Sequence, residues 1–498
     1  MNRTVCFLRD ALWRVLFILF LPLSAAALPD PEAFVNPPPD RTRVGAVIPL
    51  TGSDEAARET AMRQLERAKS LAFGFVLFDL PAETEGFWET WQAVTKRAKQ
   101  LRLPLGFTDF ALLNETSAPT ASVQFSRHIN RVLFQSQTNL PETYGTTLIG
   151  YHFPGHSVTN PPWPSTAADT NLWRETYAVT LRDLVQESGL DAGLSVEHAP
   201  LPPEEVGFFF KQPIFPLATN AWECERNTRA GGGARTMARL DCWGQLPVES
   251  PAALVTNRQA FARVSLLHDG ATRILFPFPE GISSDDETFR ALQTLCTFFN
   301  RCQWLLAQGD PPADFLYIGE NPPDFLVPYA LDRAAPAMLQ SARPKQRDLL
   351  FPSGRRYPRL LVQSGALREH PGLAALLNRY RTAGITVGQT DTDDASPPFP
   401  VWRDAADLPI PPPYRATPDN TNLLFRITRR KPASGTILLV SNTTGESGTL
   451  RVDFPDSPKG SVECWNPEDG TRVPLPLLPP AGVELPLPPF ASRFIVTP

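Results

Sequence analysis

The sequence is poor in the residues that build metal centres and disulfide frameworks. It has six cysteines and six histidines in 498 residues, with no C-x-x-C pair and no H-E-x-x-H spacing. These absences argue against a cysteine-bound structural zinc and against a catalytic zinc. Cys6 lies in the leader discussed below, and the odd number that remains cannot form a complete disulfide framework, although Cys224 and Cys242 could close a glycine-rich loop. We expect no metal site and no required cofactor.

The sequence also lacks the marks of several common function classes. No cluster of Lys and Arg builds a stripe that would hold phosphates, and the net charge is −5, which argues against nucleic acid as a partner. No G-x-G-x-x-G follows the first predicted strand, so a dinucleotide site there has no support. Ser195 lies in Gly193-Leu194-Ser195-Val196-Glu197, which lacks the second glycine of a nucleophile elbow. Serine hydrolase chemistry is therefore disfavoured.

Long apolar runs are absent except for a short one near the N-terminus. Three arginines precede the apolar run at 15–23, and Ala25-Ala26-Ala27 follows it. This pattern predicts a secretory signal peptide over residues 1–27. The alternative is a membrane anchor, but the run is shorter than the roughly 20 residues that a spanning helix needs. We expect a secreted or periplasmic protein with no membrane contact after cleavage.

Proline, in contrast, is abundant, with 54 residues. A proline-rich stretch at 28–42 is predicted to be an extended lead-in. From there to residue 310, apolar strands alternate with amphipathic helices, which predicts a parallel sheet covered by helices. The first two helices are predicted over 55–70 and 87–101. Eight strand positions over 43–310 predict a (β/α)₈ barrel of the TIM type, with a doubly wound open sheet as the alternative. The predicted strands are 44–50, 74–80, 103–110, 147–153, 190–197, 216–222, 240–248 and 272–278.

The pattern changes twice after the predicted barrel. Residues 311–389 predict a small α/β domain of the flavodoxin or glutaminase type. Residues 390–415 are rich in proline and aspartate and predict a linker. Residues 416–498 contain short strands separated by turn residues and no helical pattern, which predicts a C-terminal antiparallel β-sandwich. Its strands are predicted at 423–428, 435–441, 449–454, 461–466 and 492–496.

Candidate chemical residues are those that end apolar strands, because a parallel barrel carries its active site at the carboxyl ends of its strands. Glycosidic cleavage needs one carboxyl group to protonate the leaving oxygen and a second as base or nucleophile. Glu197 and Glu249 are the predicted catalytic pair. Other strand-end polar and aromatic residues would bind a carbohydrate substrate, since aromatic faces pack on sugar rings. These are Asp79, Asp109, His152, His198, Trp222, Asp241 and Trp243.

Several short motifs resemble those of large barrel glycosidases. They are the helix and strand of 179–197 with the following Pro202-Pro203-Glu204-Glu205-Val206-Gly207-Phe208-Phe209, Val248-Glu249-Ser250, and Glu463-Cys464-Trp465-Asn466-Pro467-Glu468-Asp469-Gly470. Together they are similar to glycoside hydrolase family 106, the α-L-rhamnosidases, and more loosely to the family 42 β-galactosidases. The resemblance implies that Glu197 is the acid and Glu249 the base or nucleophile. It also allows for bound calcium.

Two hypotheses follow from the sequence. The first is a secreted glycoside hydrolase that acts on a carbohydrate through Glu197 and Glu249. The alternative is a catalytically inactive barrel that binds glycans or partner proteins. The alternative is motivated by a chain shorter than the family 106 enzymes and by Val196, where the family pattern has glycine. The sugar and the oligomeric state are not defined by these patterns.

Overall fold

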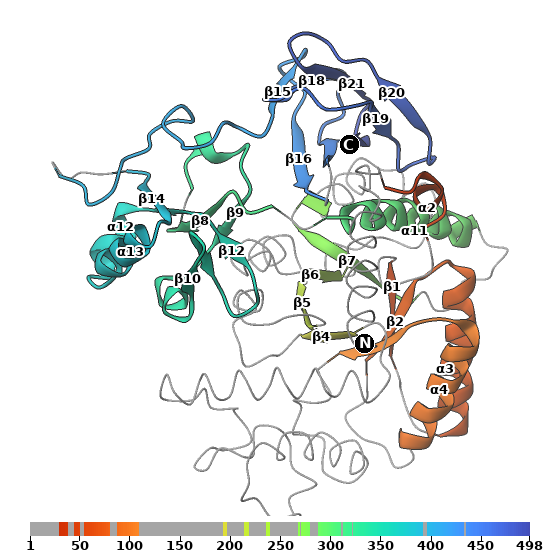
Figure 1. Cartoon of the computed structure of the whole chain (residues 1–498). Coiled ribbons are helices and arrows are strands. Elements are labelled where there is room, and N and C mark those ends of the chain that lie inside the picture. The colour runs from red at the N-terminus through yellow and green to blue at the C-terminus, as the bar shows by residue number, and fades with distance from the viewer. Residues whose placement is uncertain are drawn as a thin grey trace, which may run out of the picture.

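The computed structural model shows a mixed α/β protein with several separate sheets, as the sequence predicts (Figure 1). No helix in the part of the chain that it describes is long and apolar enough to cross a membrane. The predicted signal peptide lies outside that part. The described residues are 29–37, 44–49, 54–79, 87–108, 193–196, 214–218, 236–239, 267–268, 270–278, 287–309, 312–320, 322–391, 396–432 and 435–498.

Seven described strands pair side by side in chain order and close into a barrel. All of the pairs are parallel, and β7 returns to pair with β1. The strands are β1 (Gly45–Pro49), β2 (Phe75–Asp79), β3 (Leu105–Thr108), β4 (Gly193–Val196), β5 (Ile214–Ala218), β6 (Thr236–Arg239) and β7 (Ala271–Pro277). Because the strands are parallel, their carboxyl ends form one rim of the barrel.

The described ring differs from the predicted set of eight strands in three places. β5 occupies Ile214–Ala218, slightly ahead of the strand predicted at 216–222. β3 pairs directly with β4, so these described strands are adjacent in the ring, and the predicted strand at 147–153 lies outside the described residues. β6 occupies Thr236–Arg239, ahead of the strand predicted at 240–248, which is also outside them. The weak periodicity around the glycine-rich loop at 231–233 hid β6 from the sequence pattern.

Helices α3 (Glu55–Ser70) and α4 (Phe87–Leu101) have the predicted bounds and lie side by side on the outside of the barrel (Figure 1). The α3 helix begins where Asp54 accepts a hydrogen bond from the backbone N–H of Ala57 at 2.8 Å. This side-chain cap satisfies one of the otherwise unpaired amides of the first turn. Ala61, Leu65 and Ala68 recur at helical spacing and are all buried.

The interior of the barrel depends on one small residue. Gly45 pairs in register with Phe75 on one side and with Leu275 on the other. A Cβ atom at Gly45 would lie 2.4 Å from the Phe75 ring and 2.8 Å from the Leu275 side chain. Val47 and Leu77 join Phe75 and Leu275 in a buried cluster. The absence of a side chain at Gly45 therefore lets its two neighbours fill the space between the strands.

Helix α11 (Glu287–Leu306) packs against the barrel with both apolar and amide side chains. Asn300 Oδ1 accepts from the backbone N–H of Val44 at 2.7 Å, and its Nδ2 donates to the carbonyl of Ala72 at 3.2 Å. Gln303 Oε1 accepts from the N–H of Ile274 at 2.9 Å. Buried backbone groups need such partners. The two amides therefore fix α11 against the chain entering β1 and against β7.

A second parallel sheet stays open, with the order β14-β13-β8-β9. Two short helices follow its strands, and a small antiparallel sheet of β10, β11 and β12 lies beside it (Figure 1). The elements are β8 (Phe315–Ile318), η6 (Asp324–Leu326), β9 (Leu331–Arg333), η7 (Pro336–Ser341), β10 (Arg343–Lys345), β11 (Asp348–Leu350), β12 (Arg356–Tyr357), β13 (Arg359–Val362), α12 (Ser364–Glu369), α13 (Leu373–Thr382) and β14 (Thr386–Gln389).

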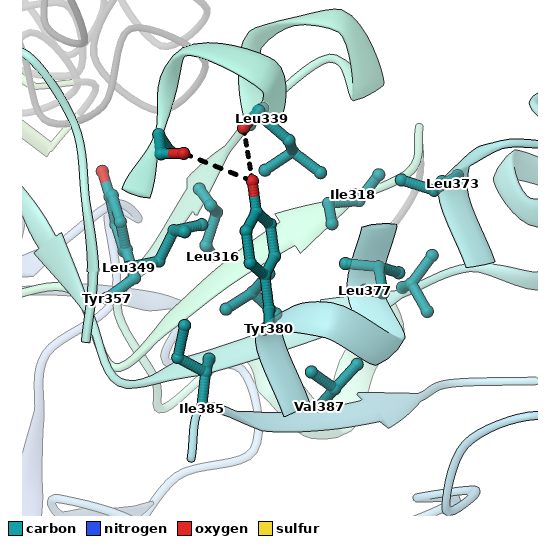
Figure 2. Close-up of a cluster of buried hydrophobic side chains, with 14 of the residues drawn as sticks. Leu316, Ile318, Leu339, Leu349, Tyr357, Leu373, Leu377, Tyr380, Ile385 and Val387 are labelled. Atoms are coloured by element: carbon teal, nitrogen blue, oxygen red, sulfur yellow. Dashed lines mark hydrogen bonds between the residues drawn. The ribbon is translucent and has the colours of Figure 1, made fainter. Parts of the chain in front are cut away.

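One face of the open sheet packs on α13 and on η7. Figure 2 shows the side chains of this core converging on Tyr380, whose hydroxyl donates to the carbonyl of Leu339. Leu316 and Ile318 of β8 point into the same cluster, as do Leu373 and Leu377 of α13. The phenol keeps its polar tip satisfied while its ring is buried, and burial raises its pKa above the usual value.

The other face of the open sheet is covered by the segment predicted as a linker. Trp402 and Leu408 are buried against Phe315 and Tyr317, and the rings of Phe315 and Trp402 lie 6.1 Å apart. A bridge between Gln389 and Val401 adds the segment to the sheet edge. The segment predicted as a linker therefore packs as an irregular cover on the sheet and is not a solvent-exposed tether.

The C-terminal part contains two antiparallel sheets with one apolar core between them. One has the order β15-β18-β21 and the other β16-β17-β22-β19-β20. Leu438 and Ile495 of the larger sheet meet Leu450 and Leu485 of the smaller one. The strands are β15 (Arg415–Pro418), β16 (Phe425–Arg430), β17 (Thr436–Asn442), β18 (Gly448–Asp453), β19 (Val462–Trp465), β20 (Arg472–Leu475), β21 (Gly482–Leu487) and β22 (Ser492–Thr497).

The lead-in at 28–42 is helical in part, where the sequence predicted an extended chain. Helix α2 (Pro31–Val35) is capped by Asp30, which accepts from the N–H of Glu32, and it starts with Pro31. Proline suits the first helical turn because its missing N–H would be unpaired there. Phe34 is fully buried, with its ring 4.9 Å from the ring of Trp465.

The glycosidase-like motif at 463–470 has a structural role. Trp465 is fully buried, and its indole N–H donates to Glu463 at 2.8 Å. Arg301 of α11 donates to the carbonyls of Pro467 and Glu468 at 3.1 and 3.0 Å. Gly470 has a φ of +78° beside the Arg301 guanidinium, where a Cβ atom would be 3.1 Å away. The motif therefore joins the β-sandwich to α11.

Candidate functional site

The rim formed by the carboxyl ends of the barrel strands is the candidate site. Asp79 is the last residue of β2 and pairs in register with Pro49, the last residue of β1. The backbone of Asp79 is described, and it stands where the sequence predicts, at the carboxyl end of its strand. It is the only predicted site residue within the described part of the chain.

The other predicted site residues lie outside the described residues. They are Asp109, His152, Glu197, His198, Trp222, Asp241, Trp243 and Glu249. Two of them follow a described strand end directly in the sequence. β3 ends at Thr108, one residue before Asp109, and β4 ends at Val196, one residue before Glu197. The structure thus brings together the strands that carry these residues, and leaves their side chains as predictions.

Glu249 and Asp241 lie at different distances in the sequence from the end of β6. The sequence predicts Glu249 as a strand-end residue that follows a strand ending at Val248, whereas the described strand of this region, β6, ends at Arg239. Asp241 follows that end closely in the sequence. Both residues lie outside the described part of the chain, so Glu249 as a catalytic residue and Asp241 as a substrate-binding residue stay predictions.

Two residues that anchor the barrel strands are not predicted from the sequence. Asn300 of α11 bonds Val44 at the amino-terminal start of β1, and Gln303 bonds Ile274 within β7, the two strands at which the ring closes. A pair of amides on the buried face of an otherwise apolar helix was the available signal. Such groups are rarely buried unless they are paired.

The described residues contain no candidate metal site, since no three or more of their His, Cys, Asp or Glu side chains lie together. The two described cysteines with clear pKa shifts are structural in character. Burial raises the pKa of Cys296 far above its usual range and that of Cys464 to about 11, which disfavours the reactive thiolate. Calcium therefore remains an expectation from the family resemblance.

Buried charge elsewhere also serves packing. Arg355 donates to Asp332 at 2.9 Å, and the Tyr357 hydroxyl donates to the same carboxylate at 2.7 Å. Burial and the neighbouring Asp332 carboxylate raise the pKa of Tyr357 well above its usual value. This cluster joins β9 of the open sheet to β12 of the small antiparallel sheet.

Comparison with known proteins gives a likeness of fold. No protein-family model matches the chain, and no curated protein sequence matches it. Among solved structures, a rhamnosidase from Novosphingobium sp. PP1Y superposes with a TM-score of 0.50 at 15% identity, over 66% of this chain and 39% of the rhamnosidase. A β-galactosidase from Bacillus circulans sp. alkalophilus gives a TM-score of 0.49 at 10% identity, over 92% of this chain and 99% of that one.

The chain therefore has a glycosidase-like fold. At 15% identity the likeness to the rhamnosidase describes fold alone, and this chain spans only 39% of the rhamnosidase's length. The similarity of fold predicted from the sequence motifs is supported at this level. Membership of family 106 stays a prediction.

Proposed function

We propose that this protein is a secreted or periplasmic glycoside hydrolase whose active site is the carboxyl-terminal rim of a (β/α)₈-type barrel. Glu197 would protonate the departing glycosidic oxygen, and a second carboxylate would activate water or attack the anomeric carbon. The predicted signal peptide supports the location. The glycosidase-like fold supports a carbohydrate as the substrate class.

The observation that carries the proposal is the run of acidic residues at neighbouring strand ends. β2, β3 and β4 are consecutive in the ring. Asp79 ends the first of them, Asp109 follows the second and Glu197 follows the third. Three carboxyl groups at adjacent strand ends match the chemistry of glycosidic cleavage, which needs two of them close together.

The identity of the second carboxylate separates two versions of the proposal. Family resemblance favours Glu249, whereas the end of β6 favours Asp241. We keep Glu249 as the base or nucleophile, with Asp241 as the direct competitor. Asp79, Asp109, His152, His198, Trp222 and Trp243 would hold the sugar.

Aryl glycosides test the proposal, beginning with α-L-rhamnosides and β-galactosides because the sequence motifs resemble the families that act on them. The Glu197→Gln variant should lose about 10²- to 10⁴-fold in kcat/KM, the usual contribution of a positioned acid. Glu249→Gln and Asp241→Asn should then differ, and the larger loss identifies the second carboxylate. Glu59→Gln is the matched control, since this side chain is 58% exposed on α3.

Two results would decide against this proposal. Equal activity of wild type and Glu197→Gln would remove Glu197 from the chemistry. The absence of hydrolysis across the panel, together with binding of glycans, would favour the inactive barrel that binds glycans or partner proteins.

A further inference from the structure

A cavity of about 500 Å³ lies where the β-sandwich, the cover of the open sheet and the barrel meet. We call it the junction cavity. It is lined by residues from four separate stretches of chain: His268, Val327, Pro328, Ala405, Pro412, Tyr414, Arg415, Ala416, Phe425, Arg426, Ile427 and Thr428. Its volume falls within the roughly 300–1,000 Å³ that is typical of small-molecule sites.

The junction cavity is separate from the proposed active site. His268 stands shortly before β7, which begins at Ala271. It therefore lies at the amino-terminal end of a barrel strand, whereas the candidate carboxylates follow the carboxyl ends. A ligand here would be bound at the opposite end of the barrel from the proposed chemistry.

Two arginines are the charged side chains among the described residues that line the junction cavity. They are Arg415 of β15 and Arg426 of β16, and no aspartate or glutamate is among those described lining residues. Arg430, further along β16, is close enough to act on His268 electrostatically. Two guanidinium groups in a partly enclosed wall favour a carboxylate or another planar anion, because they can donate pairs of parallel hydrogen bonds.

His268 supplies an unsatisfied polar atom in the same wall. The residue is 8% exposed, and its Nδ1 atom lies 2.7 Å from the Thr428 hydroxyl oxygen. Nε2 has no hydrogen-bond partner among the residues that the structure describes. Burial, with Arg426 and Arg430 nearby, lowers the pKa of this histidine well below 6.5, so the ring is neutral at pH 7. A buried polar atom with no partner is unusual and is a natural point of contact for a ligand.

The remaining wall of the junction cavity is apolar and aromatic. Tyr414 and Phe425 supply rings, Pro328 and Pro412 supply rigid edges, and Val327 is 77% exposed at the margin. Aromatic and proline faces suit the C–H face of a sugar ring. The cavity therefore combines an anion-binding side with a face for a ring.

We propose that the junction cavity binds the carboxylate of an acidic saccharide, with Arg415 and Arg426 holding the carboxylate and Tyr414 and Phe425 contacting the ring. The carboxylate part rests on the cavity itself, whereas the choice of a saccharide rests on the proposed function.

Titration calorimetry of the full chain with D-glucuronate, D-glucose and acetate tests the proposal. Glucuronate should bind at least about tenfold more tightly than either of the others, since one charge-assisted contact is worth about that factor. Arg426→Gln and Arg415→Gln should each weaken glucuronate binding about tenfold. His268→Asn, which keeps an amide near Thr428 and removes Nε2, should weaken it by about two- to tenfold.

Controls separate this site from the rim and from a loss of folding. Lys459→Gln removes an exposed cation of the β-sandwich outside the cavity and should leave binding unchanged. Arg426→Lys keeps the charge and should bind more tightly than Arg426→Gln at an equal melting temperature. Glu197→Gln should bind glucuronate like wild type, even if hydrolysis is never observed.

Three outcomes would overturn the proposal. They are equal binding of glucuronate and glucose, binding that Arg415→Gln and Arg426→Gln leave unchanged, and glucuronate binding that is lost in Glu197→Gln alone. Binding of acetate as tight as that of glucuronate would refute the saccharide part. Glucuronate binding that depends on both arginines in a chain with no hydrolase activity would support this site and count against the proposed function only.

Discussion

In the barrel the parallel strands close on one another, whereas the parallel sheet β14-β13-β8-β9 stays open. The barrel fills its interior with its own side chains, at a place where Gly45 makes room for Phe75 and Leu275. The open sheet buries one face under α13 and the other under the irregular segment that contains Trp402. The closed barrel thus depends on how well the side chains of its own strands pack in the interior. The open sheet depends on helices and an irregular segment that cover its two faces.

Removing the aromatic side chain that covers the open sheet should cause the largest loss of stability. Trp402→Ala removes a ring that is 7% exposed and packs on Phe315, so we expect a loss of about 3–5 kcal/mol in the free energy of unfolding. Urea unfolding followed by circular dichroism measures it. Trp402→Phe should restore most of the loss. A change below about 1 kcal/mol for Trp402→Ala would mean that the segment only rests on the sheet.

Adding a side chain at Gly45 inside the barrel should cause the next largest loss of stability. Gly45→Ala forces a methyl group to 2.4 Å from the Phe75 ring and should cost about 1–3 kcal/mol in unfolding free energy. Gly365→Ala is the matched control, because no atom lies within 4 Å of its added Cβ and the residue is in helix α12. It should leave stability unchanged or raise it by up to about 1 kcal/mol. Equal effects of the two changes would refute the role of Gly45.

Removing the side-chain hydrogen bonds that attach α11 to the barrel should cause the third largest loss of stability. Asn300→Leu removes the acceptor of the Val44 N–H and the donor to Ala72 while keeping a similar volume. Leaving these backbone groups unpaired should cost about 1–2 kcal/mol in unfolding free energy. Thr297→Val on the same helix serves as the control, since its hydroxyl donates only to the α11 carbonyl of Gln293. Equal losses in the two variants would contradict the account of Asn300.

Removing the cap of helix α3, on the outside of the barrel, should cause the smallest loss of stability. Asp54→Ala removes the cap of α3 and should cost about 1 kcal/mol. Asp54→Asn, which keeps a cap acceptor, should recover most of that loss. A thermal melt that does not distinguish the two variants would show that the cap is not needed once α3 is packed on the barrel.

Sequence patterns predicted the elements whose signals are local. The bounds of α3 and α4 were correct because a cap and a helical spacing lie within the segments themselves. Strand β21 was missed, although Val483, Leu485 and Leu487 are buried at alternate positions, because Pro486 makes the stretch read as a turn. β20 was missed for the same reason, with Pro474 on an edge strand.

Contacts between distant segments could not be predicted in this way. Asn300 pairs with Val44, and Arg301 reaches Pro467, across stretches of chain that no local pattern connects. The cover function of Trp402 was hidden because proline and aspartate content reports irregular backbone and not burial. For the candidate site, sequence placed Asp79 at a strand end, and the adjacency of β2, β3 and β4 came only from the fold.

The dependence of hydrolysis on the leaving group tests the central claim most directly. If Glu197 protonates the departing oxygen, Glu197→Gln should lose about 10²- to 10⁴-fold in kcat/KM on a disaccharide. It should lose less than about tenfold on the matching 2,4-dinitrophenyl glycoside, whose leaving group needs no proton. Equal losses on both substrates, or no loss on either, would contradict the assignment of the barrel rim as an active site with Glu197 as its acid.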